Sequence, residues 1–160
     1  MLKTVENKFN YLINYKRNEF ELVKQINKKN FNSIISLIEK TIKLKKNIFV
    51  CGNGGSAADA QHLAAEMLIR LRPENNREGL RALALAQDTS TITACSNDFG
   101  YDRLYERLVS TLANKQDVLI CFSTSGNSKN IILALEKAKE MGIKRFGFLG
   151  SDGGSALRLC

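Results

Sequence analysis

The stretch that decides the fold reads IFVCGNGGSAADAQ and spans residues 48–61. Its first four residues are apolar and typical of a strand, the next five are small or polar, and the last five favour a helix. A helix that follows such a loop presents free N–H groups and the positive end of its dipole to a ligand. The stretch therefore predicts a strand–loop–helix unit with an anion site, for which phosphate is the usual guest.

A second stretch of the same design reads VLICFSTSGNSKNIILALE and spans residues 118–136. Its loop carries four hydroxyl groups, on Ser123, Thr124, Ser125 and Ser128. Hydroxyl donors and backbone N–H groups are what a monophosphate needs, although a turn that only caps a helix has the same composition. Two such loops on one small sheet predict a single phosphorylated ligand that is held by both.

Apolar runs and helical periodicity alternate along the rest of the chain, which predicts an α/β protein with a parallel sheet covered on both faces. Ser56 and Asp88 are the expected N-caps of two helices, and Asn97–Gly100 is expected to form a turn. The predicted strands are 47–51, 80–86, 117–122 and 144–149, and the predicted helices are 5–28, 31–45, 56–70, 89–94, 102–113 and 128–141.

Charge is concentrated at the start of the chain. The protein has a net charge of +8, and residues 1–50, with eleven basic and four acidic residues, account for +7 of it. The lysines alternate with apolar residues at helical spacing, which indicates a solvated helix face rather than a surface for nucleic acid or membrane. No apolar run approaches the roughly 18 residues of a membrane span, and the first residues lack a signal core, so we expect a cytoplasmic protein. The four cysteines form no C-x-x-C pair.

Several polar side chains could carry chemistry. His62, Glu66 and Arg70 follow one another at four-residue spacing and lie on one helix face. Histidine and carboxylate at this spacing can share a metal ion, or Glu66 can act as a general base; an ordinary surface pair is the alternative. Arg70 could contact a sugar hydroxyl or a phosphate, or simply end a helix in solvent. Asn97 and Asp98 could bind sugar hydroxyls, or serve only the turn.

A nucleotide-binding protein is another interpretation. Gly52, Gly54 and Ala57 match G-x-G-x-x-A, a loose form of the dinucleotide fingerprint. That fingerprint needs an acidic residue about 20 positions on, at the end of the second strand. Glu74 and Glu78 instead lie in a polar loop, and the hydroxyl-rich second loop has no place in this interpretation.

Taken together, the motifs resemble those of the phosphoheptose isomerases, which are sugar-isomerase (SIS) domain proteins. The resemblance implies a flavodoxin-like parallel sheet in a three-layer sandwich, preceded by two N-terminal helices. It implies one SIS domain over residues 1–160, with 1–46 as a helical extension used in a homotetramer. The apolar surface of residues 5–28 independently favours an interface there. The resemblance rests on residues 51–56, Asp59, Ala60, His62, Ala64, Glu66, Arg70, 97–100, 123–128 and 150–154.

The resemblance also implies an activity. These enzymes convert sedoheptulose 7-phosphate to glycero-manno-heptose 7-phosphate through an enediol, for the heptose of lipopolysaccharide or capsule. By resemblance Glu66 is the general base, and His62 and Glu66 are ligands of a zinc ion. The residues implied to bind the substrate are Asn53, Gly54, Gly55, Ser56, Glu66, Arg70, Asn97, Asp98, Ser123, Thr124, Ser125 and Ser128.

One departure and one alternative accompany this resemblance. The family supplies a glutamine and a histidine from a C-terminal helix that would follow Cys160, so we expect the last strand and helix to be absent and these 160 residues to be weakly active or inactive. The alternative is the non-catalytic SIS-domain protein that binds the bacterial replication initiator. That relative carries a small polar residue at the position of Glu66 and arginine at that of Ser125, so these two residues favour the isomerase.

Overall fold

The computed structural model describes residues 10–11, 13–17, 21, 28–85 and 87–160. The predicted helix at 5–28 lies mostly outside these residues. The chain divides into two compact units, residues 1–36 and 37–160, and the second holds the sheet and the candidate site. The second predicted helix is α2, Lys28–Lys43. Among the described residues, no helix has both the length and the apolar character needed to cross a membrane.

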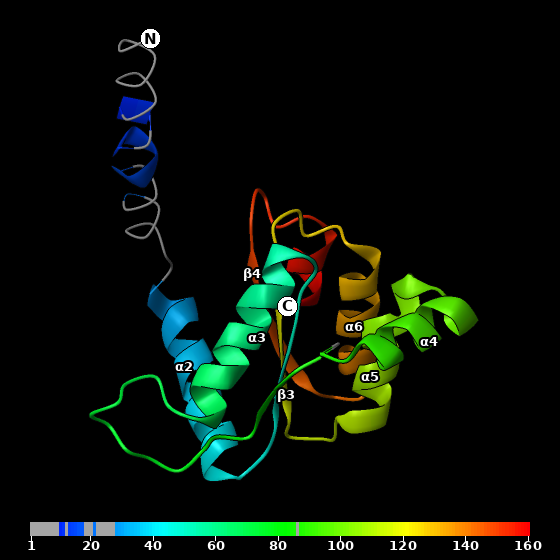
Figure 1. Cartoon of the computed structure of the whole chain (residues 1–160), viewed down its shortest axis with the longest axis horizontal. Helices are drawn as coiled ribbons and strands as arrows, with labels where there is room; N and C mark the ends of the chain where they lie inside the picture. Colours follow the sequence, from blue (N-terminus) through cyan, green and yellow to red (C-terminus); the bar gives the residue numbers. More distant parts are fainter. Residues whose placement is uncertain (1–9, 12, 18–20, 22–27, 86) are drawn as a thin grey trace. The chain divides into compact units, whose positions relative to one another are not determined.

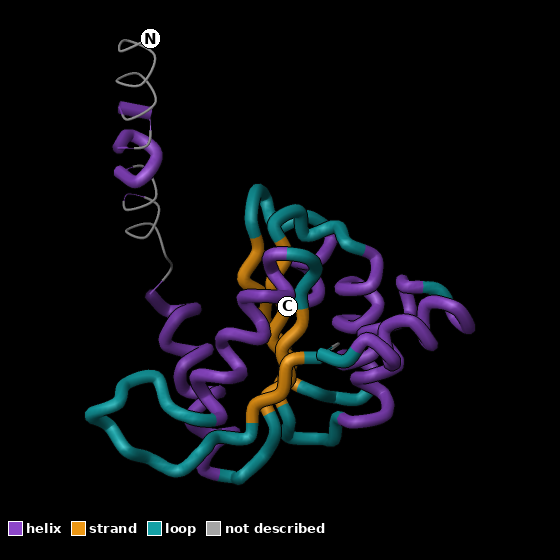
Figure 2. Tube along the Cα trace, viewed as in Figure 1, coloured by secondary structure: helices purple, strands orange, loops and turns teal. Residues whose placement is uncertain are grey.

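Four strands form one sheet, drawn in orange in Figure 2. They are β1 (Ile48–Cys51), β2 (Ala82–Ala84), β3 (Val118–Ser123) and β4 (Lys144–Leu149). Their order is β2-β1-β3-β4, and every pair is parallel, which confirms the predicted parallel sheet. The second strand is shorter than the predicted 80–86.

Burial explains why the two central strands are continuous apolar runs. All four residues of β1 and the first four of β3 are buried, because helices cover both faces of the sheet. The two strands run in register, with Cys51 opposite Cys121. Strand β4 lies at the edge and is more exposed, with Phe148 half exposed and stacked on Phe122.

Helices form a layer on each side of the sheet, as Figure 1 shows. Helix α3 (Gly55–Leu68) packs on β1, β2 and β3, whereas α6 (Lys129–Glu140) packs on β3 and β4. Helix α5 (Leu104–Leu112) packs against α6 and follows a single 3-10 turn, η1 (Tyr101–Arg103). The result is the expected three-layer α/β sandwich.

Two predicted helix ends differ from the structure, and in both cases a glycine with a positive φ explains the difference. Helix α3 begins at Gly55 and its N-cap is Gly54, with φ of 57°, so the prediction of Ser56 as the cap is wrong. Glycine adopts this left-handed conformation without a steric cost. Helix α4 (Thr89–Phe99) includes Asn97 and Asp98, so the turn predicted at 97–100 is wrong too, and Gly100, with φ of 83°, ends the helix.

The other start signal is confirmed. The Asp88 side chain caps α4 by accepting a hydrogen bond of 2.7 Å from the backbone N–H of Thr91. After β4, the loop 150–154 leads into a short 3-10 helix, η2 (Ser155–Leu159).

Candidate active site at the ends of strands β1 and β3

Both predicted ligand loops lie at the point where the strand order reverses. The chain leaves β1 for a helix on one face of the sheet and leaves β3 for a helix on the other, so the two loops diverge from neighbouring strand ends. Open α/β sheets bind their ligands in the crevice at such a point. A cavity of about 460 Å³ lies beside this point, between the start of α3 and the ends of β3 and β4, and Ser56, Asp59, Ser123, Thr124 and Gly150 are among its lining residues.

Hydroxyl groups of the second loop accept hydrogen bonds within the loop and can still donate hydrogen bonds to a ligand. Ser123 Oγ accepts the backbone N–H of Gly126 at 3.1 Å, and Ser125 Oγ accepts that of Asn127 at 3.1 Å. Each hydroxyl uses one lone pair to accept this hydrogen bond, and its O–H group can still donate to a ligand. Ser128 is the N-cap position of α6, and its side chain makes no capping hydrogen bond. The loop is therefore both a structured turn and an array of donors.

Side chains from three other elements, α5, η1 and α6, form hydrogen bonds with the first loop. The Tyr105 hydroxyl donates a hydrogen bond to the Gly52 carbonyl. Burial raises the pKa of Tyr105, which keeps this hydroxyl protonated as a donor. Asn53 Oδ1 accepts from the Tyr101 hydroxyl at 2.9 Å, and the Asn53 amide also exchanges two hydrogen bonds with that of Asn130. Gly54 and Gly55 remain exposed at the start of α3.

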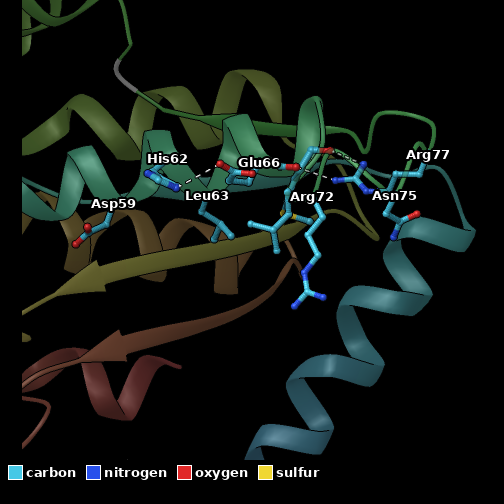
Figure 3. Close-up of a pocket in the computed structure, with 9 residues that line it drawn as sticks. Asp59, His62, Leu63, Glu66, Arg72, Asn75 and Arg77 are labelled. Atoms are coloured by element: carbon cyan, nitrogen blue, oxygen red, sulfur yellow. Dashed lines mark hydrogen bonds and ion pairs between the residues drawn. The ribbon is translucent and has the colours of Figure 1, made fainter. Parts of the chain in front are cut away.

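A larger cavity of about 810 Å³ follows the face of α3 (Figure 3). Asp59 lines both this cavity and the one at the loops, so the two cavities adjoin at this residue. The lining side chains of the larger cavity combine charged, polar and apolar types: Asp59, His62, Leu63, Glu66, Met67, Leu71, Arg72, Asn75 and Arg77.

Glu66 combines a partnered and an unpartnered oxygen in this cavity. Its Oε1 lies 3.4 Å from His62 Nε2, one helical turn away. Its Oε2 is buried and has no hydrogen-bond partner, although 31% of the side chain as a whole is exposed. An unpartnered buried carboxylate oxygen is costly unless a ligand, a metal or a proton meets it. Glu66 is therefore placed to accept a proton or to bind a cation.

Arg77 is a residue that the sequence did not single out. Figure 3 shows its guanidinium turned back onto the end of α3. There Nη2 donates to the carbonyl of Glu66 at 2.7 Å, and Nη1 donates to the carbonyls of Met67 and Glu78, each at 2.9 Å. Arg77 lies nine residues beyond the end of α3, so no local signal in the sequence marks this contact.

Of the residues expected in the two loops, Asn53, Gly54, Gly55, Ser125 and Ser128 do not line either cavity. Three further expected residues lie outside the loops. The Arg70 guanidinium is exposed and donates to the Pro73 carbonyl at 3.3 Å, and Arg70 does not line either of the two cavities. Asn97 and Asp98 are exposed on the last turn of α4, where they hydrogen-bond to each other at 2.8 Å, and they do not line these cavities either.

Comparison with known proteins identifies the family. The family model described as "SIS domain" matches residues 13–150. A phosphoheptose isomerase of Helicobacter pylori (strain P12) is 47% identical over 143 residues, which is 85% of this chain and 73% of that protein. The chain belongs to the phosphoheptose isomerase family of SIS-domain proteins. A phosphoheptose isomerase of Aliarcobacter butzleri is 53% identical over 76% of this chain and 63% of its own length.

Solved structures agree with this family. The structure of phosphoheptose isomerase GmhA from Neisseria gonorrhoeae is 36% identical with a TM-score of 0.79, over 96% of this chain and 77% of that one. A phosphoheptose isomerase from Francisella tularensis is 34% identical with a TM-score of 0.69, over 76% of this chain and 65% of that one. These relatives confirm the predicted α/β SIS fold and favour the isomerase over the initiator-binding regulator.

The zinc ion implied for phosphoheptose isomerases can be tested against the residues present. Protein zinc sites use three or four nitrogen, sulfur or oxygen ligands. His62 and Glu66 supply two, and the described part of the chain holds no cluster of three or more histidine, cysteine, aspartate or glutamate side chains suited to a metal. The residues described here do not make a zinc site by themselves, and the metal stays a prediction.

Proposed function

We propose that this protein interconverts the ketose and aldose forms of a seven-carbon sugar phosphate, sedoheptulose 7-phosphate and glycero-manno-heptose 7-phosphate. The observation that carries the proposal is the buried, unpartnered Oε2 of Glu66, a residue lining a cavity that shares Asp59 with the cavity at the second loop. The family to which the chain belongs supports the same reaction. Because the chain spans 63–73% of the length of the two relatives compared, the proposal concerns the protein that contains these residues.

The phosphate is proposed to sit at the second loop. Ser123, Thr124, Ser125 and Ser128 offer hydroxyl donors beside the N-terminus of α6. Charge-assisted hydrogen bonds from such donors to an anion are about twice as strong as neutral ones. The phosphate would anchor one end of the substrate and leave the sugar chain to extend along α3.

The distance along α3 suits a seven-carbon substrate. From Asp59, where the cavities adjoin, to Glu66 is seven residues, which an α-helix covers in about 10 Å. An extended heptose with its phosphate ester spans roughly the same length at about 1.5 Å per carbon–carbon bond. A substrate with its phosphate near Asp59, on the side of the second loop, would bring its carbonyl end toward Glu66.

Glu66 is proposed to move the proton. The reaction removes a proton from the carbon next to the carbonyl while the carbonyl oxygen gains one, which forms an enediol. The carbon-bound proton is then returned to the former carbonyl carbon while the hydroxyl oxygen on the other carbon loses its proton, which forms the new carbonyl. A carboxylate that lines the cavity and has an oxygen without a hydrogen-bond partner can act as the base. His62, on the same helix and 3.4 Å away, would orient the carboxylate rather than act from the opposite side of the substrate.

The experiment is the isomerisation of sedoheptulose 7-phosphate by the purified protein that contains these residues and by its Glu66→Gln variant. Removal of a general base should lower kcat at least 100-fold. Glu136→Gln is the matched control, because Glu136 is an exposed residue of α6, and it should keep wild-type activity. Full turnover by Glu66→Gln would refute the assignment of the base.

Zinc binding, assembly and the biological setting belong to the same proposal. His62 and Glu66 would be two zinc ligands, and a homotetramer in the cytoplasm would supply heptose for lipopolysaccharide or capsule. Exposed Phe31 and Ile35 on α2 support an interface that uses the N-terminal helices. Light scattering at micromolar concentration measures the assembly state, and a clean monomer would contradict the tetramer.

A further inference from the structure

Asn130 links the two ligand loops. It is the second residue of α6, directly after the phosphate loop, and only 2% of its surface is exposed. Its Nδ2 donates to Asn53 Oδ1 at 2.9 Å, and its Oδ1 accepts from Asn53 Nδ2 at 2.8 Å. The Oδ1 atom also accepts the backbone N–H of Ile131 at 3.0 Å. The Asn130 side chain therefore holds the first loop and its own helix start at fixed positions.

The partner of Asn130 has little capacity left for a substrate. Asn53 Oδ1 accepts both the Asn130 amide and the Tyr101 hydroxyl, which uses its two lone pairs. Asn53 Nδ2 donates one of its two hydrogens to Asn130. The Asn53 side chain thus serves mainly as the connection between the first loop and α6.

We propose that Asn130 is a positioning residue for this reaction: through its amide pair with Asn53, it fixes the spacing between the loop that holds the phosphate and the loop that contacts the sugar. The inference rests on the proposed function. A substrate that contacts both loops needs them at the correct separation, and displacement of a contact by about 1 Å can cost on the order of 100-fold in rate.

Two ligands separate the loops experimentally. Inorganic phosphate uses the second loop alone, whereas sedoheptulose 7-phosphate uses both. We expect Asn130→Ala to weaken binding of the sugar phosphate at least tenfold in calorimetry and binding of inorganic phosphate less than twofold. Asn53→Ala should give the same selective loss, and the double variant no more than either single one, because the two residues act as one unit.

Controls cover folding and general surface effects. Asn114→Ala is the matched control. This exposed residue precedes β3 and so lies beyond the amino-terminal ends of the strands, whereas the two loops follow the carboxyl-terminal ends. Tyr101→Phe removes a single hydrogen bond to Asn53 from an exposed ring, and should give a smaller loss with the same selectivity. It tests the connection even if Asn130→Ala does not fold.

The outcomes are distinct. Equal weakening of both ligands by Asn53→Ala and Tyr101→Phe would show that the amide pair only supports the fold, and would overturn the inference. Unchanged affinity for the sugar phosphate in these variants would overturn it as well. If the wild-type protein binds the sugar phosphate no more tightly than inorganic phosphate, the proposed function fails and the inference falls with it.

Discussion

Replacing Arg77 by alanine should destabilise the protein by about 2 kcal/mol. The guanidinium makes three hydrogen bonds, of 2.7, 2.9 and 2.9 Å, to the carbonyls of Glu66, Met67 and Glu78. Hydrogen bonds from a charged donor contribute roughly 1.5–3 kcal/mol each when buried. The first two are only partly buried and the third is exposed, so we assign about 1 kcal/mol to each of the first two and nothing to the third.

Urea unfolding at neutral pH measures this loss directly. Arg72→Ala is the matched control: Arg72 lines the same cavity, and its guanidinium makes no hydrogen bond to any described residue. The control should lie within about 0.5 kcal/mol of wild type. Arg77→Lys should fall between the two, because one ammonium cannot reproduce the planar fork. Equal stabilities of Arg77→Ala and Arg72→Ala would refute the role of Arg77 in fixing the end of α3.

Three other outcomes are expected. Replacing Ser123 and Ser125 together by alanine should weaken inorganic phosphate binding at least tenfold in calorimetry, and unchanged affinity would exclude the second loop as the phosphate site. A hydrogen bond from the Thr91 backbone N–H lowers the pKa of Asp88. The contribution of the ionised Asp88 side chain to the free energy of unfolding is therefore present above about pH 4 and is lost as the pH falls through the pKa of the folded state. In the Asp88→Asn variant, the free energy of unfolding measured with urea should fall less steeply at acid pH. Burial raises the pKa of the Cys51 thiol to about 12, so Ellman's reagent at pH 8 should modify it only as fast as the protein unfolds, and rapid labelling would contradict that burial.

The sheet could be predicted from the sequence because its signals are local and strong. Residues 48–51 and 118–121 are continuous apolar runs, and each leads into small residues and then a helix. The strand order itself is not encoded in any single stretch. Burial of β1 and β3 on both faces requires them to lie at the centre.

Helix ends were harder to predict, for a physical reason. Ser56 has the chemistry of an N-cap, but Gly54 reaches the left-handed conformation that the loop needs, and the helix starts before Ser56. Asn97 and Asp98 have turn propensity, yet the helix continues through them until Gly100. Side-chain preference is a weak prior when a nearby glycine can end or start the helix instead.

In the candidate site, too, some residues could be predicted from the sequence and others could not. Glu66 and the hydroxyl loop could be proposed from spacing, because a helix face and a loop after a strand place residues predictably. The Arg77 clamp and the Asn53–Asn130 pair could not be predicted, because each joins elements whose contact depends on the tertiary fold. Asn53 and Asn130 are 77 residues apart in sequence.

The position of β1 between β2 and β3 also determines when the sheet can form during translation. Residue Val118, which pairs with Ile48, emerges from the ribosome about seventy residues later. At 5–20 residues per second, the apolar strand Ile48–Cys51 waits roughly 4–14 s for its second neighbour. Such long-range pairing folds slowly, and the crevice does not exist until it is complete. Substrate therefore cannot guide early folding, and a chaperone that shields the first strand during translation should raise the yield of active protein.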